Sequence, residues 1–120
     1  MIETRQGLER VEEIAAVPGV DGIYVGPADL AISLGLAPTM DVTEKAHVEA
    51  VRRIRETCRK HGIAVGIHAA SGEWAKRHAE AEFDMVTVAP DATLLKGAAR
   101  REVEVARSGL TESEPGLGYS

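Results

Sequence analysis

The chain has 120 residues, of which 44% are hydrophobic and 28% charged, and its formal net charge is −5. This length suits one domain, and the acidic balance, with no basic stripe or aromatic platform, argues against nucleic-acid binding. The single cysteine, Cys58, excludes a disulfide within the chain. No apolar run reaches the roughly 18 residues of a membrane span and no signal peptide is recognisable, so we expect a cytoplasmic protein without a membrane partner.

Hydrophobic periodicity and turn residues divide the chain into four strand–helix units. Short apolar runs predict strands over residues 1–3, 20–25, 63–67 and 85–88. Apolar residues at helical spacing predict helices over residues 5–17, 43–61, 72–81 and 91–107. A loop is expected over residues 26–36, with a short helical turn at 29–34. Residues 108–120, with little apolar content, are expected to form a flexible tail.

Several single residues have a predicted structural role. Thr4 is a suitable N-cap, and Gly62 is a suitable end for the long helix. Cys58 continues the apolar face of that helix, which indicates a packing residue rather than a nucleophile. The predicted helices contain three histidines, which are expected to be solvated: His47, His61 and His78.

Alternating strands and helices predict an α/β fold with a parallel sheet. Four strand–helix units can form a small open sheet, or half of an eight-stranded barrel, which needs about 250 residues when complete. A half-barrel would leave two strand edges and an apolar wall uncovered, and would therefore need a partner. A small flavodoxin-like, non-enzymatic domain is a further alternative, but it would need a phospho-acceptor pocket that the acidic residues do not suggest.

Two carboxylates follow two of the predicted strands. Glu3 closes the first strand, and Asp29 follows the second after a Gly-Pro turn. Ligands of parallel α/β folds bind at this end of the strands, and neighbouring strands lie only about 4.8 Å apart. Both carboxylates can therefore reach one ion, and oxygen ligands suit Mg²⁺ or Mn²⁺, with Co²⁺ possible. The alternative is that Asp29 caps a short helix and Glu3 is a solvated end residue.

The turn before Asp29 has its own predicted chemistry. Gly26 and Pro27 shape the turn, and they expose the backbone amides of Ala28 and Asp29 to an anion. His68 ends the third predicted strand at the same edge of the sheet. It is a candidate acid–base group, although a structural role is the simpler interpretation.

These motifs resemble those of a known family. Ile-Glu-Thr-Arg at residues 2–5, Gly-Pro-Ala-Asp-Leu at residues 26–30 and Ser-Leu-Gly at residues 33–35 are similar to the HpcH/HpaI aldolases. These are divalent-metal-dependent, pyruvate-using (class II) lyases related to the citrate lyase β-subunit. The resemblance covers residues 1 to about 107 and is strongest over residues 1–35. It implies that residues 1–107 form the second half, strands five to eight, of a (β/α)8 TIM barrel.

The resemblance also implies a function. Glu3 and Asp29 match the two metal-ligand carboxylates, and the amides of Ala28 and Asp29 match the site of the pyruvate carboxylate. The implied reaction cleaves or forms the C–C bond of a 2-oxo-4-hydroxy acid, giving pyruvate and an aldehyde through a metal-stabilised enolate. The resemblance further implies a role in the catabolism of aromatic compounds.

The same resemblance implies what the chain lacks. The family's histidine base and its substrate-orienting arginine belong to the first half of the barrel, and no residue of this sequence matches them. The chain is therefore expected either to be an aldolase or to be an incomplete half-barrel that binds metal and pyruvate without catalysing the reaction. Family members are commonly oligomeric, so association with further copies or with a missing N-terminal half is implied.

Overall fold

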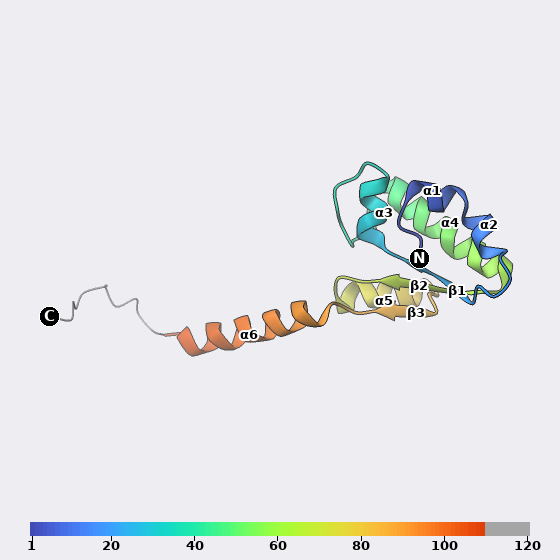
Figure 1. Cartoon of the computed structure of the whole chain (residues 1–120). Helices are drawn as coiled ribbons and strands as arrows, with labels where there is room; N and C mark the ends of the chain where they lie inside the picture. Colours follow the sequence, from blue (N-terminus) through green and yellow to red (C-terminus); the bar gives the residue numbers. More distant parts are fainter. Residues whose placement is uncertain (110–120) are drawn as a thin grey trace. The chain divides into compact units, whose positions relative to one another are not determined.

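The structure is a computed structural model that describes residues 1–109. Its chain divides into two units, residues 1–90 and the segment that begins at Asp91, and each is described by itself (Figure 1). Within the described residues, no helix is both long enough and apolar enough to cross a membrane.

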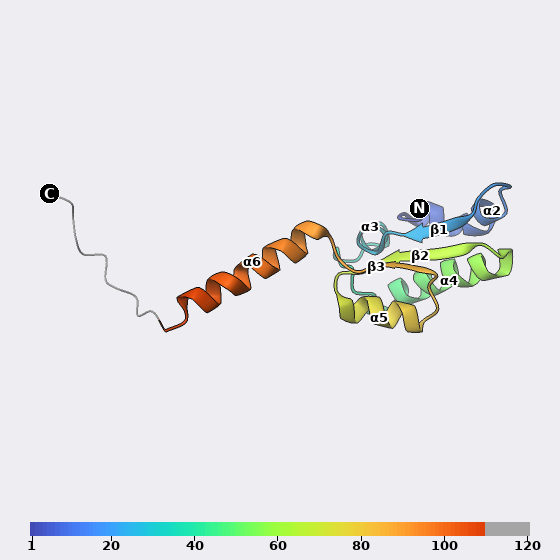
Figure 2. The ribbon, with the colours of Figure 1, turned by 90° about the horizontal axis from the view of Figure 1, so that it is seen from below.

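Three parallel strands form the sheet of the first unit (Figure 2). The strands, in their order across the sheet, are β1 (Gly22–Val25), β2 (Ala64–His68) and β3 (Met85–Thr87). The first predicted strand is reduced to a single parallel bridge, in which Ile2 pairs with Val25. Each strand thus lies beside the strand that follows it in the sequence, which confirms the predicted parallel α/β architecture.

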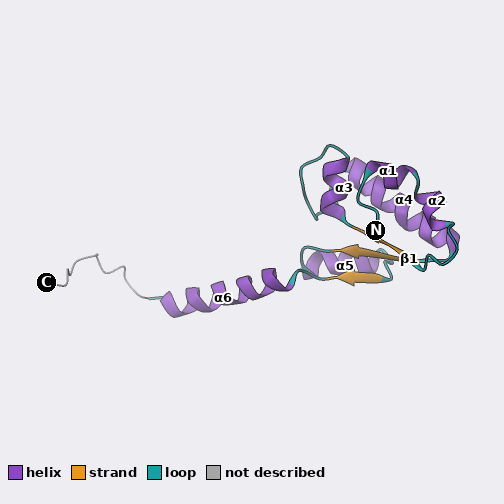
Figure 3. Cartoon of the chain, in the orientation of Figure 1, coloured by secondary structure: helices purple, strands orange, loops and turns teal. Residues whose placement is uncertain are grey.

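Five helices accompany this sheet (Figure 3). They are α1 (Arg5–Glu9), α2 (Val11–Ala15), α3 (Pro27–Ser33), α4 (Lys45–His61) and α5 (Gly72–Glu80). The predicted caps are confirmed. The Thr4 hydroxyl accepts a hydrogen bond from the Gly7 amide at 3.0 Å, and Gly62 ends α4 with a left-handed backbone, φ 66°.

Two predicted elements are wrong in detail. The expected helix over residues 5–17 is two short helices, because Arg10 leaves helical geometry (φ −99°, ψ 14°) and α2 then packs against α4. The helical turn expected at residues 29–34, within the loop over residues 26–36, is present but longer than predicted. Helix α3 begins directly at Pro27, whose fixed φ suits the first helical position.

The core lies on one face of the sheet. Alternate strand residues point into it, from β1 Ile23 and Val25 and from β2 Val65 and Ile67. They pack against α4, whose Cys58 is fully buried, as predicted. Helices α4 and α5 lie along the same side of the strands (Figure 2).

No described element of the first unit covers the opposite face of the sheet. Gly22 and Ala64 are exposed there, and Met85 is 55% exposed. This face also presents the side chains that alternate with the core residues, including Tyr24 and His68. The first unit is therefore a layer of helices on a sheet with one bare side.

The expectation of solvated histidines is wrong for two of the three. His47 is fully buried and His78 is 6% exposed. His47 shares its helix face with Ala50, Val51 and Ile54, so α4 carries it into the core with its apolar neighbours. Burial lowers the pKa of both imidazoles, because the charged form would lose its hydration.

The second unit contains one described element, α6 (Asp91–Arg107). None of its residues is buried. Its exposed large apolar side chains are Leu94, Leu95, Val103 and Val105. Of the predicted tail, residues 110–120 lie outside the described part of the chain.

Candidate functional site

One cavity lies at the carboxyl ends of the strands. Its volume is about 160 Å³, far below the range of roughly 300–1,000 Å³ typical for drug-sized ligands, so it suits a small molecule. All of the sequence-predicted site residues line it: Glu3, Gly26, Pro27, Ala28, Asp29 and His68. The fold therefore brings together residues from the N-terminal segment, the β1–α3 turn and β2.

Glu3 reaches the cavity by lying across Gly26. A Cβ atom built on Gly26 would be 2.6 Å from Glu3 Oε1 and 2.8 Å from Glu3 Cγ. The backbone of Gly26 is extended (φ −97°, ψ 93°), so other residues could adopt it. The glycine is needed because the space that a side chain would take is occupied by the Glu3 carboxylate.

Asp29 lies in the first turn of α3, directly after β1. Pro27 occupies the start of this helix, and the first backbone hydrogen bond of the turn runs from the Leu30 amide to the Gly26 carbonyl at 3.0 Å. No described group accepts a hydrogen bond from the amides of Ala28 or Asp29. Free amides at the start of a helix are suitable donors for an anionic ligand.

The segment that bears Glu3 is tied to the helix that bears Asp29. The Arg5 amide donates to Ser33 Oγ at 2.7 Å, and Arg5 Nη2 donates to the Leu34 carbonyl at 3.2 Å. Arg5 and Ser33 thus join the N-terminal segment to the end of α3.

The charges of the cavity favour a cation. Glu3 is half-buried and Asp29 is exposed, and neither forms an ion pair with a residue of the described range. No arginine or lysine side chain of residues 1–109 lines the cavity. Residues 1–109 contain no group of three or more metal-ligating side chains, so Glu3 and Asp29 would leave further ligand positions to water or substrate.

A hydrogen-bonded group in the same region has no counterpart in the sequence-based prediction. Thr87 Oγ1 lies 2.6 Å from His68 Nδ1 and 2.7 Å from the Tyr24 hydroxyl. The three side chains come from three neighbouring strands. Their alternation along the strands places them on one face, but only the strand register shows that they meet.

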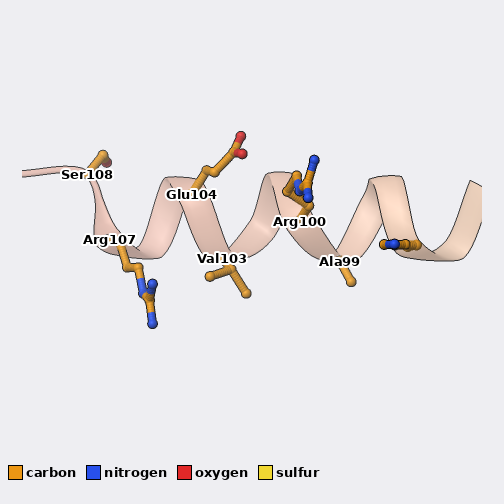
Figure 4. A pocket seen from close by; sticks show the side chains of 7 residues that line it. Ala99, Arg100, Val103, Glu104, Arg107 and Ser108 are labelled. Carbon is orange, nitrogen blue, oxygen red and sulfur yellow. The ribbon is translucent and has the colours of Figure 1, made fainter.

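A second hollow, on α6, is not a site of this kind. Figure 4 shows Ala99, Arg100, Val103, Glu104 and Arg107 along this helix. A single described helix forms it, and no residue of α6 is buried. It is the exposed surface of a helix, without converging groups.

Comparison with known proteins gives a consistent result. Residues 1–98 match the sequence profile described as HpcH/HpaI aldolase/citrate lyase. A hydroxypyruvate/pyruvate aldolase of Rhizorhabdus wittichii is 44% identical over 108 residues, which are 90% of this chain and 43% of that protein. A 4-hydroxy-2-oxo-heptane-1,7-dioate aldolase of Escherichia coli is 39% identical over 120 residues, which are 97% of this chain and 44% of that protein.

Solved structures also match. An HpcH/HpaI aldolase/citrate lyase family protein of Burkholderia cenocepacia superposes with a TM-score of 0.83 at 38% identity, over 89% of this chain and 41% of the other. An HpcH/HpaI aldolase of Desulfitobacterium hafniense superposes with a TM-score of 0.82 at 23% identity, which shows likeness of fold alone. The chain thus spans less than half the length of the relatives it matches.

Proposed function

Because the chain belongs to the HpcH/HpaI aldolase/citrate lyase family, we propose that it provides the cation-binding and 2-oxo-acid-binding part of a pyruvate-type aldolase. The observation that supports this most directly is the pair Glu3 and Asp29. Both carboxylates line one small cavity without an ion-pairing partner among the described residues. Two such charges in one cavity repel each other unless a cation lies between them.

Each group of the site has a proposed role. Glu3 and Asp29 hold a divalent cation, for which Mg²⁺ or Mn²⁺ is the best match and Co²⁺ is possible. When bound, the cation supplies Lewis acidity for the negative charge that develops on the 2-oxo group. The Gly26-Pro27 turn presents the amides of Ala28 and Asp29 to the substrate carboxylate.

The proposed reaction is the cleavage or formation of the C–C bond in a 2-oxo-4-hydroxy acid, with pyruvate and an aldehyde as the smaller partners. The names of the relatives, a hydroxypyruvate/pyruvate aldolase and a 4-hydroxy-2-oxo-heptane-1,7-dioate aldolase, support this class of substrate. A cytoplasmic location and a role in aromatic catabolism stay predictions.

We further propose that residues 1–107 correspond to the second half of a (β/α)8 barrel. Three features support this: the strands follow one another in chain order, the helices of the first unit cover one face, and the other face is bare. A flavodoxin-like sheet would reverse its strand order at a switch point and carry helices on both faces. The bare face would be covered by another half-barrel, as a separate chain or as part of a longer one.

Catalytic competence is a separate proposal. The family's histidine base and orienting arginine have no counterpart in this sequence, so the chain alone is proposed to bind cation and 2-oxo acid. Full aldol chemistry then requires the first half of the barrel as well. The alternative, an enzyme that is active by itself, needs a base within residues 1–120.

Two measurements test the proposal. Binding of Mn²⁺, followed by the loss of the free-ion electron paramagnetic resonance signal, is expected for the chain and should be abolished in Asp29→Asn. Asp91→Asn, the same change on α6, is the control and should bind normally. Equal binding by all three proteins would refute the metal site.

The second measurement is proton NMR of pyruvate in D₂O, with and without Mg²⁺. Metal-dependent loss of the methyl signal would show that the chain forms the enolate unaided. An unchanged signal, with Mn²⁺ binding intact, would support a half-site that needs a partner for catalysis.

A further inference from the structure

Tyr24, His68 and Thr87 form a connected hydrogen-bonding group on the bare face of the sheet. Thr87 Oγ1 lies 2.6 Å from His68 Nδ1 and 2.7 Å from the Tyr24 hydroxyl, and the Tyr24 hydroxyl lies 3.4 Å from Nδ1. Both hydroxyls therefore face the same ring nitrogen. The other nitrogen, Nε2, forms no hydrogen bond with a described group.

The backbone is built to allow this arrangement. Tyr24 on β1 pairs in register with Gly66 on β2, and His68 pairs with Thr87 on β3. A Cβ atom on Gly66 would lie 2.7 Å from Cδ2 of the Tyr24 ring. The glycine thus lets the tyrosine ring cross β2 and bring its hydroxyl to Thr87 on the third strand.

Two arrangements of the hydrogens fit the distances, and the donor strengths favour one of them. If Tyr24 donates to Thr87 and Thr87 donates to His68, both hydroxyl hydrogens have acceptors and Nδ1 is an acceptor. If instead Nδ1 carried the proton, it would donate to Thr87 and Thr87 would donate to Tyr24. The phenol, which is the more acidic hydroxyl and the better donor, would then donate to no described residue. The first arrangement leaves the proton of a neutral imidazole on Nε2.

We infer that Thr87 and Tyr24 hold neutral His68 as its Nε2–H tautomer, so that His68 offers a hydrogen-bond donor, rather than a base, to the cavity that contains Glu3 and Asp29. Its role in catalysis rests on the proposed function, because His68 lines the proposed site for the 2-oxo acid. The donor would serve a carbonyl or hydroxyl oxygen of the bound acid. Thr87 is then a positioning residue, which acts through His68.

The place of His68 at the end of a strand suggests an acid–base group, but in this tautomer His68 acts as a hydrogen-bond donor. An imidazole whose Nδ1 accepts from Thr87 has no free lone pair on Nε2 with which to remove a methyl proton. The base for enolate formation must therefore come from another group. His68 instead supplies a polar hydrogen-bond donor that orients the bound acid.

The test is ¹⁵N NMR of the full 120-residue chain with labelled histidine, at about pH 9, where imidazoles are neutral. His68→Gln identifies the His68 signals among the four histidines. We expect a protonated Nε2 and an unprotonated Nδ1 shifted by its hydrogen bond. Thr87→Val should move the Nδ1 resonance to the position of an unbonded nitrogen, Thr87→Ser should restore it, and Tyr24→Phe should move it less. A proton on Nδ1 in the unaltered chain, or no response to Thr87→Val, would overturn the inference.

Adding Mn²⁺ to the same sample separates this inference from the proposed function. Broadening of the His68 signals would place the ion near the ring and support the cation site. If the proton lies on Nε2 but Mn²⁺ does not broaden the His68 signals, the inference about His68 is retained and the cation site is rejected. Broadening with a proton on Nδ1 would retain the cation site and reject the inference.

Discussion

Replacing Gly26 with alanine should weaken the proposed cation site while leaving the fold intact. The added Cβ would lie 2.8 Å from Glu3 Cγ, and a normal carbon–carbon contact is about 3.5 Å, so the Glu3 side chain must retreat by roughly 0.7 Å or more. Metal–ligand distances tolerate changes of only about 0.2 Å. The backbone at Gly26 is compatible with alanine, so the change acts through Glu3.

The displacement of Glu3 sets the expected size of the effect. Disturbing the groups that orient a metal ligand typically reduces affinity about 10- to 100-fold, which is about 1.4–2.7 kcal/mol of binding free energy. Gly26→Ala should therefore bind Mn²⁺ about 10- to 100-fold more weakly in an electron paramagnetic resonance titration. Circular dichroism should show an unchanged helix content.

Gly72→Ala is the matched control, because a Cβ on Gly72 would meet no atom within 4 Å. This variant should bind Mn²⁺ as the unaltered chain does. Glu3→Gln, which keeps the shape of the side chain but removes its charge, should also weaken binding. Normal binding by Gly26→Ala together with weak binding by Glu3→Gln would refute the argument that Gly26 makes room for the ligand.

Three further results are expected. Burial lowers the pKa of His47 and His78 below the ordinary 6.5. As the pH falls below 6.5, the unfolded chain therefore binds more protons than the folded chain, and the free energy of unfolding should fall by up to about 1.4 kcal/mol per pH unit for each histidine. Urea titrations between about pH 7.5 and 5 measure this, and a free energy of unfolding that does not change with pH would contradict it. Burial raises the pKa of the Cys58 thiol, so thiol reagents should label it only as fast as the chain unfolds. Leu30→Ala removes a fully buried side chain and should lower the free energy of unfolding by about 2–5 kcal/mol in the same urea titrations, whereas a loss below 1 kcal/mol would mean that α3 is loosely packed.

Local sequence patterns predicted the elements whose causes are local. The end of α4 at Gly62, the N-cap at Thr4 and the position of β2 follow from short-range steric and hydrogen-bonding rules. The prediction of a solvated His47 is wrong because it follows from the polarity of the imidazole alone. The position of His47 on the apolar stripe of α4 decides its burial. Helical spacing therefore predicts the burial of His47 better than its residue type does.

Some features of the candidate site can likewise be predicted from the sequence, and others cannot. The motifs placed Glu3, Gly26, Pro27, Ala28 and Asp29 at one edge of the sheet, because the ends of parallel strands meet there. The packing of Glu3 across Gly26 depends on how close two distant segments approach, which no sequence spacing encodes. The contacts from Tyr24 to Thr87 depend likewise on strand register.

The strand order of the sheet has a consequence for how the chain folds during synthesis. Ile2 pairs with β1, β1 with β2 and β2 with β3, so each strand meets a partner that has already left the ribosome. Among the described strands, none has to wait for one made much later, and each new pairing extends an existing edge. A nascent chain that ends shortly after β2 already contains the helix α4 and most of the buried apolar cluster. The sheet can thus grow in one direction, from the amino-terminal end, while translation continues.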